Sequence, residues 1–156
     1  MPPLDPLLIT YGPALARVAG HYARSPAERD DLLQDIVVAA WRALPTFRGE
    51  CSPRTFLLRV AHNRAVSWSA HRRPFEPEVE TAVDMHVDQQ IDARGRRIAL
   101  QRAVRELPEG QRQVVVLVLE DLTHAEIADV LGISENNVAV RLNRAREALR
   151  QTLGGQ

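Results

Sequence analysis

Residues 121–150 carry the pattern that most restricts how this chain can fold. Thr123, followed three residues later by Glu126, forms a capping box that marks the start of a helix. Gly132 can adopt the positive φ angle that ends a helix abruptly, and Ser134 can cap a second one. The apolar residues of that second helix recur at helical spacing: Val138, Leu142, Ala145 and Leu149. The stretch therefore predicts two helices joined by a tight turn.

A helix-turn-helix of this kind can place its second helix in a DNA major groove. A helical hairpin in any protein core would show the same caps and spacing. The charges favour the DNA-binding interpretation, because arginines outnumber the acids Glu135 and Glu147 on the second helix and can contact phosphates. These arginines are Arg141, Arg144, Arg146 and Arg150.

The composition predicts an all-α fold. Aromatic residues make up 4% of the 156 residues, and the strong helix formers Ala, Arg and Leu are the commonest residues. A run of valines at 114–118 is also compatible with a strand. We interpret 109–120 as a helix with buried residues 114–119, because the run lies between two helical segments and has no evident partner strand. Pro108 separates it from a helix that begins near Arg96.

The charge pattern divides the chain into two small helical domains joined by an acidic linker. The formal net charge is zero, yet residues 51–73 contain five arginines and no acid, whereas 74–95 contain six acids and one arginine. We expect a first domain at 1–73, a linker at 74–95 and a helix-turn-helix domain of four helices at 96–156. Fully extended, the linker reaches about 73 Å at roughly 3.3 Å per residue, which matches two turns of DNA at about 70 Å. Relaxed, it would average about 26 Å, which indicates a compact free form.

The first domain is expected to contain three or four helices. Residues 28–44 carry a wide apolar stripe, in which we assign Trp41 to the core. Residues 53–71 form a further helix that begins with a proline, and Phe56 is assigned to its buried side.

Catalytic and metal sites are not expected. The histidines share no ligand spacing with one another or with Cys51, and no phosphate loop or nucleophile elbow is present. We predict no catalytic residue, no cofactor and no metal. One cysteine, no leader and no long apolar run favour a cytoplasmic protein without membrane insertion.

Three segments together resemble a known family. Residues 29–44 (RDDLLQDIVVAAWRAL) resemble the polymerase-binding helix of bacterial sigma-70 factors. Residues 47–63 (FRGECSPRTFLLRVAHN) resemble the promoter-melting segment of the extracytoplasmic-function (ECF) branch, and 107–150 resemble that branch's domain for the −35 element. The segments occur in the family's order and cover nearly the whole chain.

The resemblance implies a sigma factor that binds core RNA polymerase, recognises −10 and −35 promoter elements and promotes strand opening. The implied polymerase contacts are Asp31, Gln34 and Asp35. The implied −10 contacts are Phe47, Arg48, Ser52, Arg54, Asn63 and Arg64. The implied −35 contacts are Ser134, Asn136, Asn137, Ala139, Val140, Arg141, Asn143 and Arg144. Where this chain has Ala139 and Val140, the family often has a basic residue and Ser; short apolar side chains can contact thymine methyl groups.

The implied partners are core polymerase, promoter DNA and, as an open question, an anti-sigma factor, with a monomer expected in the absence of polymerase. Two alternatives stay open at the level of the sequence. One is a helix-turn-helix regulator that binds DNA without docking to polymerase. The other is a helical adaptor that binds protein partners.

Overall fold

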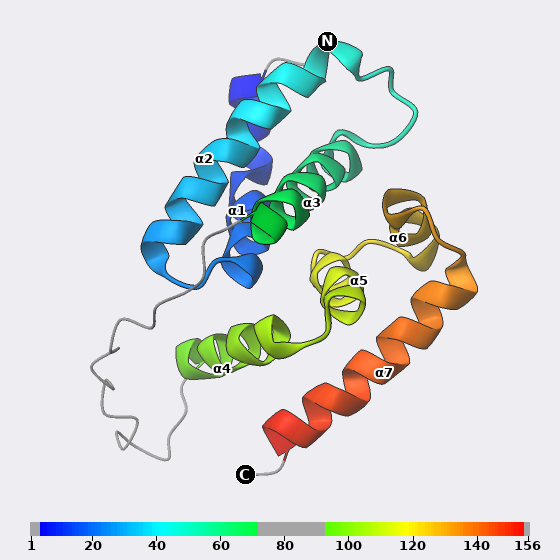
Figure 1. Ribbon diagram of the computed structural model, residues 1–156. Coiled ribbons are helices and arrows are strands. Elements are labelled where there is room, and N and C mark those ends of the chain that lie inside the picture. The colour runs from blue at the N-terminus through cyan, green and yellow to red at the C-terminus, as the bar shows by residue number, and fades with distance from the viewer. Residues whose placement is uncertain (1–3, 72–92, 155–156) are drawn as a thin grey trace.

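The computed structural model describes residues 4–71 and 93–154 (Figure 1). Neither range contains a strand, so the predicted all-α class is confirmed. The N-terminal unit comprises α1 (Leu4–Tyr22), α2 (Pro26–Ala43), the 3-10 helix η1 (Leu44–Thr46) and α3 (Pro53–His71). The C-terminal unit comprises α4 (Ala93–Glu106), α5 (Glu109–Leu119), α6 (His124–Leu131) and α7 (Glu135–Gly154). No described helix combines the length and apolar character needed to cross a membrane.

Helices α2 and α3 of the N-terminal unit begin in the same way, with a serine before a first-turn proline. The hydroxyl of Ser25 accepts a hydrogen bond from the backbone N–H of Glu28 at 3.1 Å, and that of Ser52 accepts one from Thr55 at 3.0 Å. Each serine satisfies one of the free N–H groups at its helix start. The three helices enclose a core of fully buried side chains, which includes Leu15, Val18, Leu32, Ile36, Leu57 and Ala61.

The C-terminal unit contains the predicted helix-turn-helix. Thr123 and Glu126 form a capping box at the start of α6, Gly132 ends that helix with a φ of 69°, and Ser134 accepts from the backbone of Asn137 at 3.0 Å. Val114, Val115 and Val116 are buried inside α5, so the helical interpretation of the valine run is confirmed. Figure 1 shows α7 crossing the unit as its longest helix, with α6 beside its N-terminal end.

Three expectations need correction. Trp41 is 65% exposed rather than buried, and Leu119 is 40% exposed although it ends the valine-rich helix. Trp41 lies nine residues after buried Leu32, and at 100° per residue this places it on roughly the opposite side of α2. The helix expected near Arg96 begins at Ala93, so 93–95 belong to α4. Predicted linker residues 74–92 lie outside the described residues.

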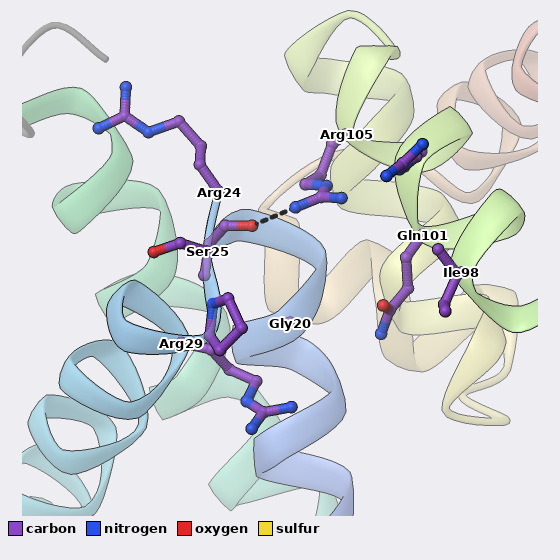
Figure 2. Close-up of a pocket in the computed structure, with 10 residues that line it drawn as sticks. Gly20, Arg24, Ser25, Arg29, Ile98, Gln101 and Arg105 are labelled. Carbon is purple, nitrogen blue, oxygen red and sulfur yellow. Dashed lines mark hydrogen bonds between the residues drawn. The ribbon is translucent and has the colours of Figure 1, made fainter. Parts of the chain in front are cut away.

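The two units touch through α1 and α3 on one side and α4, α5 and α6 on the other. Arg105 donates from Nη1 to the backbone oxygen of Ala23 at 2.7 Å, across a pocket that Ser25, Arg29, Ile98 and Gln101 also line (Figure 2). A Cβ added at Gly20 would lie 3.2 Å from Gln101 Nε2, so the missing side chain lets α4 approach α1 closely.

Candidate nucleic-acid interface

Helix α7 presents a polar face away from its own core. Val138, Leu142 and Ala145 are buried against α5 and α6. The opposite side carries Asn136, Val140 and Asn143, all exposed and spaced by four and three residues, with exposed Arg144 on its flank. Ser134 is also exposed, and Ala139 is half-buried at the edge of this face. A short helix face with amide and guanidinium groups is suited to reading base edges.

Arg141 lies on the flank of α7 that faces α5. It is half-buried, and its Nε donates to Asn137 Oδ1 at 3.2 Å. A Cβ added at Gly110, at the start of α5, would lie 3.2 Å from Arg141 Nη1, so the guanidinium rests on α5. Arg141 and Asn137 remain predicted −35 contacts, and their side chains are hydrogen-bonded to each other in this structure.

A second candidate surface runs along α2. Asp31, Gln34, Val38 and Trp41 are exposed and recur at intervals of three and four residues, so they share one side of the helix. Val38 is 41% exposed, and together with Trp41 it gives this side an apolar strip next to a carboxylate and an amide. Exposed apolar side chains that adjoin one another mark a protein-binding surface. Sequence reasoning did not include Val38 or the exposure of Trp41.

Asp35 differs from its neighbours on α2 because its carboxylate already has a partner. Arg64 on α3 donates to Asp35 Oδ2 from Nε at 3.1 Å and also from Nη2. The ion pair is only partly exposed at both ends. The structure thus joins one predicted polymerase residue to one predicted −10 residue, and Asp35 is not a freely exposed contact.

The loop from Phe47 to Ser52, before α3, is held at both of its ends. The rings of Phe47 and Phe56 meet with centroids 4.8 Å apart; both are half-buried, and Phe56 packs against the core. At the other end, the hydroxyl of Ser52 caps α3 and donates to Thr55 Oγ1 at 3.0 Å. Between them, Arg48 is exposed, and Gly49 has a φ of 75°. Ser52 therefore has a local structural role that the sequence interpretation did not assign.

Asn63 is exposed on α3, next to a buried histidine. His62 is 5% exposed, and burial lowers the pKa of its imidazole to about 4. The neutral ring fills the core side of α3, while Asn63 and Arg64 stand on its outer side. Asn63 is consequently free to meet a ligand that binds along this helix.

Arg54, at the start of α3, lies against the C-terminal unit. Its guanidinium is 3.7 Å from the carboxylate of Glu120, which follows α5, and its side chain is 32% exposed. The next residue, Thr55, donates from Oγ1 to Glu126 Oε2 at 2.7 Å. The hydrogen bonds from Thr123 and Thr55, with Arg54 nearby, hold the pKa of Glu126 below its usual value. Arg54, a predicted −10 contact, thus lies near an acid of the C-terminal unit.

Comparison with known proteins identifies the family. The model described as Sigma-70 region 2 matches residues 7–74, and the model described as Sigma-70, region 4 matches residues 97–149. The RNA polymerase sigma factor CnrH of Cupriavidus metallidurans is 31% identical over 157 residues, covering 92% of this chain and 82% of CnrH. The chain belongs to the sigma-70 family. The resemblance stated from its sequence motifs is confirmed.

Other relatives indicate the branch of the sigma-70 family to which the chain is similar. The ECF RNA polymerase sigma factor SigM of Mycobacterium tuberculosis is 31% identical over 153 residues, covering 96% of this chain and 76% of SigM. The structure of CnrH in complex with the cytosolic domain of CnrY has a TM-score of 0.73 at 28% identity, covering 98% of this chain and 88% of that one. This sigma factor is of the ECF type: it binds core RNA polymerase and recognises promoters.

Proposed function

We propose that the sigma-factor activity is divided along the chain as the sequence indicates. Residues 1–73 would bind core polymerase and the −10 element, 74–95 would link the halves, and 96–156 would bind the −35 element. In this proposal the protein acts by binding alone, with no catalytic residue of its own, and works in the cytoplasm as a monomer until it meets polymerase. An anti-sigma partner is part of the proposal, since the CnrH relative was solved with the cytosolic domain of CnrY.

The polymerase contact is assigned to the outer side of α2. The observation that carries this assignment is the exposure of Trp41, at 65%, beside Val38, Gln34 and Asp31. Burying the large apolar surface of an exposed tryptophan under a partner protein is favourable in free energy. Tryptophan is therefore enriched at binding hot spots. Asp35 supports this face indirectly, through its ion pair with Arg64.

The −10 contact is assigned to the 47–54 loop and the outer side of α3. Capturing an unstacked base needs a pocket edge, hydrogen-bonding groups and nearby cations. Arg48 and Asn63 supply exposed groups, and Arg54 and Arg64 supply cations once their carboxylate partners are displaced. Phe47 and Ser52 shape the loop through Phe56 and the α3 cap.

The −35 contact is assigned to α7, with Asn136, Val140 and Asn143 facing the bases. Arg144 on the flank reaches either a base edge or a phosphate, and Ser134 at the helix start is placed for a phosphate. Ala139 adds an apolar surface for thymine methyl groups. Arg141 and Asn137 support this face from the side of α5, where they bond to each other.

The decisive experiment is run-off transcription with purified core polymerase. Gln34→Ala combined with Trp41→Ala should weaken core binding roughly tenfold or more and lower transcription in proportion. Asp35 is not changed, because its loss would leave Arg64 without its partner and would mix an effect on the −10 contact with an effect on polymerase binding. Ile9→Ala is the matched control, because Ile9 is an apolar residue on α1 that is 81% exposed.

Two results would contradict the proposal. If the double variant has native circular dichroism and binds core polymerase as tightly as the wild type, the outer side of α2 is not the polymerase contact. Binding of the wild-type protein to duplex promoter DNA as tightly without polymerase as with it would favour a polymerase-independent regulator.

A further inference from the structure

A pocket lined by arginines lies where the end of α1 and the start of α2 meet α4 (Figure 2). Its volume is about 200 Å³, below the roughly 300–1,000 Å³ of sites for drug-sized ligands. None of the described residues in its lining is acidic, and four of them are arginines: Arg24, Arg29, Arg102 and Arg105. We call this site the arginine pocket.

Arg24 belongs to a local ion pair and adds little to the charge of the arginine pocket. Its Nη2 donates to Glu28 Oε2 at 2.8 Å, and its Nε donates to Glu28 Oε1 at 3.1 Å. Figure 2 shows the Arg24 side chain directed away from α4. The positive charge of the described lining therefore rests on Arg29, Arg102 and Arg105.

Arg105 and Arg29 keep their charge at the pocket although both have contacts. Arg105 Nη1 donates to the backbone oxygen of Ala23 at 2.7 Å. A carbonyl oxygen has no net charge, so this bond fixes the position of the guanidinium without cancelling its charge. Arg29 lies 3.5 Å from the carboxylate of Asp30, and both side chains are exposed. Water and salt screen such a surface pair strongly.

Gly20 on α1 leaves room for two side chains to meet over its backbone. A Cβ added at Gly20 would lie 3.2 Å from Gln101 Nε2 and 3.8 Å from Arg29 Cδ. The amide of Gln101 on α4 and the side chain of Arg29 on α2 therefore approach the same point. Both groups carry N–H donors, so the two sides of the arginine pocket present donors to whatever lies between them.

The start of α2 adds to the positive potential. Pro26, the first residue of this 18-residue helix, belongs to the lining, and Ser25 caps the helix beside it. The N-terminal end of a helix carries a partial positive charge that favours anions. This partial charge has the same sign as the three guanidinium groups, so the whole site favours an anion.

The number of charges indicates which anion fits. Guanidinium groups bind phosphate oxygens through paired N–H donors. One phosphate monoester carries about −1.5 to −2 charges at pH 7, so three arginines are balanced by two phosphate groups rather than by one. Ile98, which is 41% exposed and also in the lining, offers an apolar surface to an organic part of the ligand.

We propose that the arginine pocket binds the diphosphate group of a small ligand, held by Arg29, Arg102 and Arg105 together with the amide of Gln101. None of these residues is assigned to polymerase or to DNA in the proposed function. The proposal can therefore fail or succeed independently of it.

Isothermal titration of the full chain with inorganic pyrophosphate tests the proposal. One saturable site is expected per chain, with weaker binding of inorganic phosphate and of sulfate at equal ionic strength. Absence of saturable pyrophosphate binding would overturn the proposal. So would equal affinities for pyrophosphate and sulfate, because they would indicate an unspecific attraction of charges.

Charge-neutral variants test the location of the site. Arg29→Gln combined with Arg102→Gln should weaken pyrophosphate binding roughly tenfold or more. Arg96→Gln combined with Arg97→Gln is the matched control, because both residues are exposed on α4 outside the described lining and the change in net charge is the same. Equal losses in the two double variants would refute the assignment to the arginine pocket.

Gln101→Glu is a second variant that leaves the arginines in place. It keeps the size of the side chain and puts a carboxylate where the diphosphate would bind, so pyrophosphate binding should be lost while circular dichroism stays native. Unchanged pyrophosphate affinity in this folded variant would contradict the proposal.

Two further titrations identify the source of the phosphate groups. Displacement of pyrophosphate by ADP would support a nucleoside diphosphate as the ligand, and absence of displacement would support free pyrophosphate. Duplex DNA of random sequence tests the macromolecular alternative. If Arg29→Gln with Arg102→Gln lowers DNA affinity while pyrophosphate does not bind the wild type, the pocket is a contact for the DNA backbone and the small-ligand proposal is wrong.

Discussion

Acidification should destabilise this protein through His62 on α3. The imidazole is 5% exposed, and burial lowers its pKa from 6.5 to about 4. At pH 5 the folded protein keeps His62 neutral, whereas the unfolded chain binds a proton there, so the free energy of unfolding falls as the pH drops below 6.5. At roughly 1.36 kcal/mol per pH unit, the loss is about 2 kcal/mol at pH 5 and about 3.4 kcal/mol well below pH 4.

Urea unfolding followed by circular dichroism at pH 7.5 and pH 5 measures this loss. Between the two pH values, the wild type should lose about 2 kcal/mol more than His62→Gln, which has no group to protonate. His21 is also buried and titrates in both proteins, so its contribution cancels in the difference. His71→Gln, an exposed change on the same helix, should behave like the wild type. Equal losses in the wild type and His62→Gln would refute the reasoning.

Three further predictions concern the DNA surfaces. Asn63→Ala should reduce strand opening at the −10 element more than recruitment to the promoter, because Asn63 is exposed on α3. Normal permanganate reactivity of the −10 bases would show that Asn63 is not part of the −10 site. Arg144→Ala should lower transcription from the cognate promoter by roughly 5- to 150-fold, equivalent to about 1–3 kcal/mol, and flatten the preference at one −35 position. An equal loss on every promoter variant would make Arg144 a phosphate contact. Cys51→Ser should leave transcription unchanged in reductant and in mild peroxide, because the chain has no second cysteine to form a disulfide with; a mutant that resists peroxide while the wild type does not would contradict this.

The sequence by itself determined the features whose partners lie within one helical turn. The capping box of Thr123 and Glu126, the left-handed Gly132 and the serine cap before α7 depend on residues only a few positions apart. Helical periodicity similarly determined the buried side of α7. The motifs that identify the family are continuous stretches of sequence, from 29–44 on α2 to 107–150, which spans α5, α6 and α7.

Only the tertiary structure decided which charged groups meet. Arg17 and Glu120 are 103 residues apart in the chain, Thr55 and Glu126 are 71 apart, and Arg64 and Asp35 are 29 apart. No spacing rule links such positions, because their contact depends on how whole helices pack. The exposure of Trp41 and Leu119 and the burial of Glu120 have the same origin: an apolar side chain is covered, or a carboxylate desolvated, only where another helix lies against it.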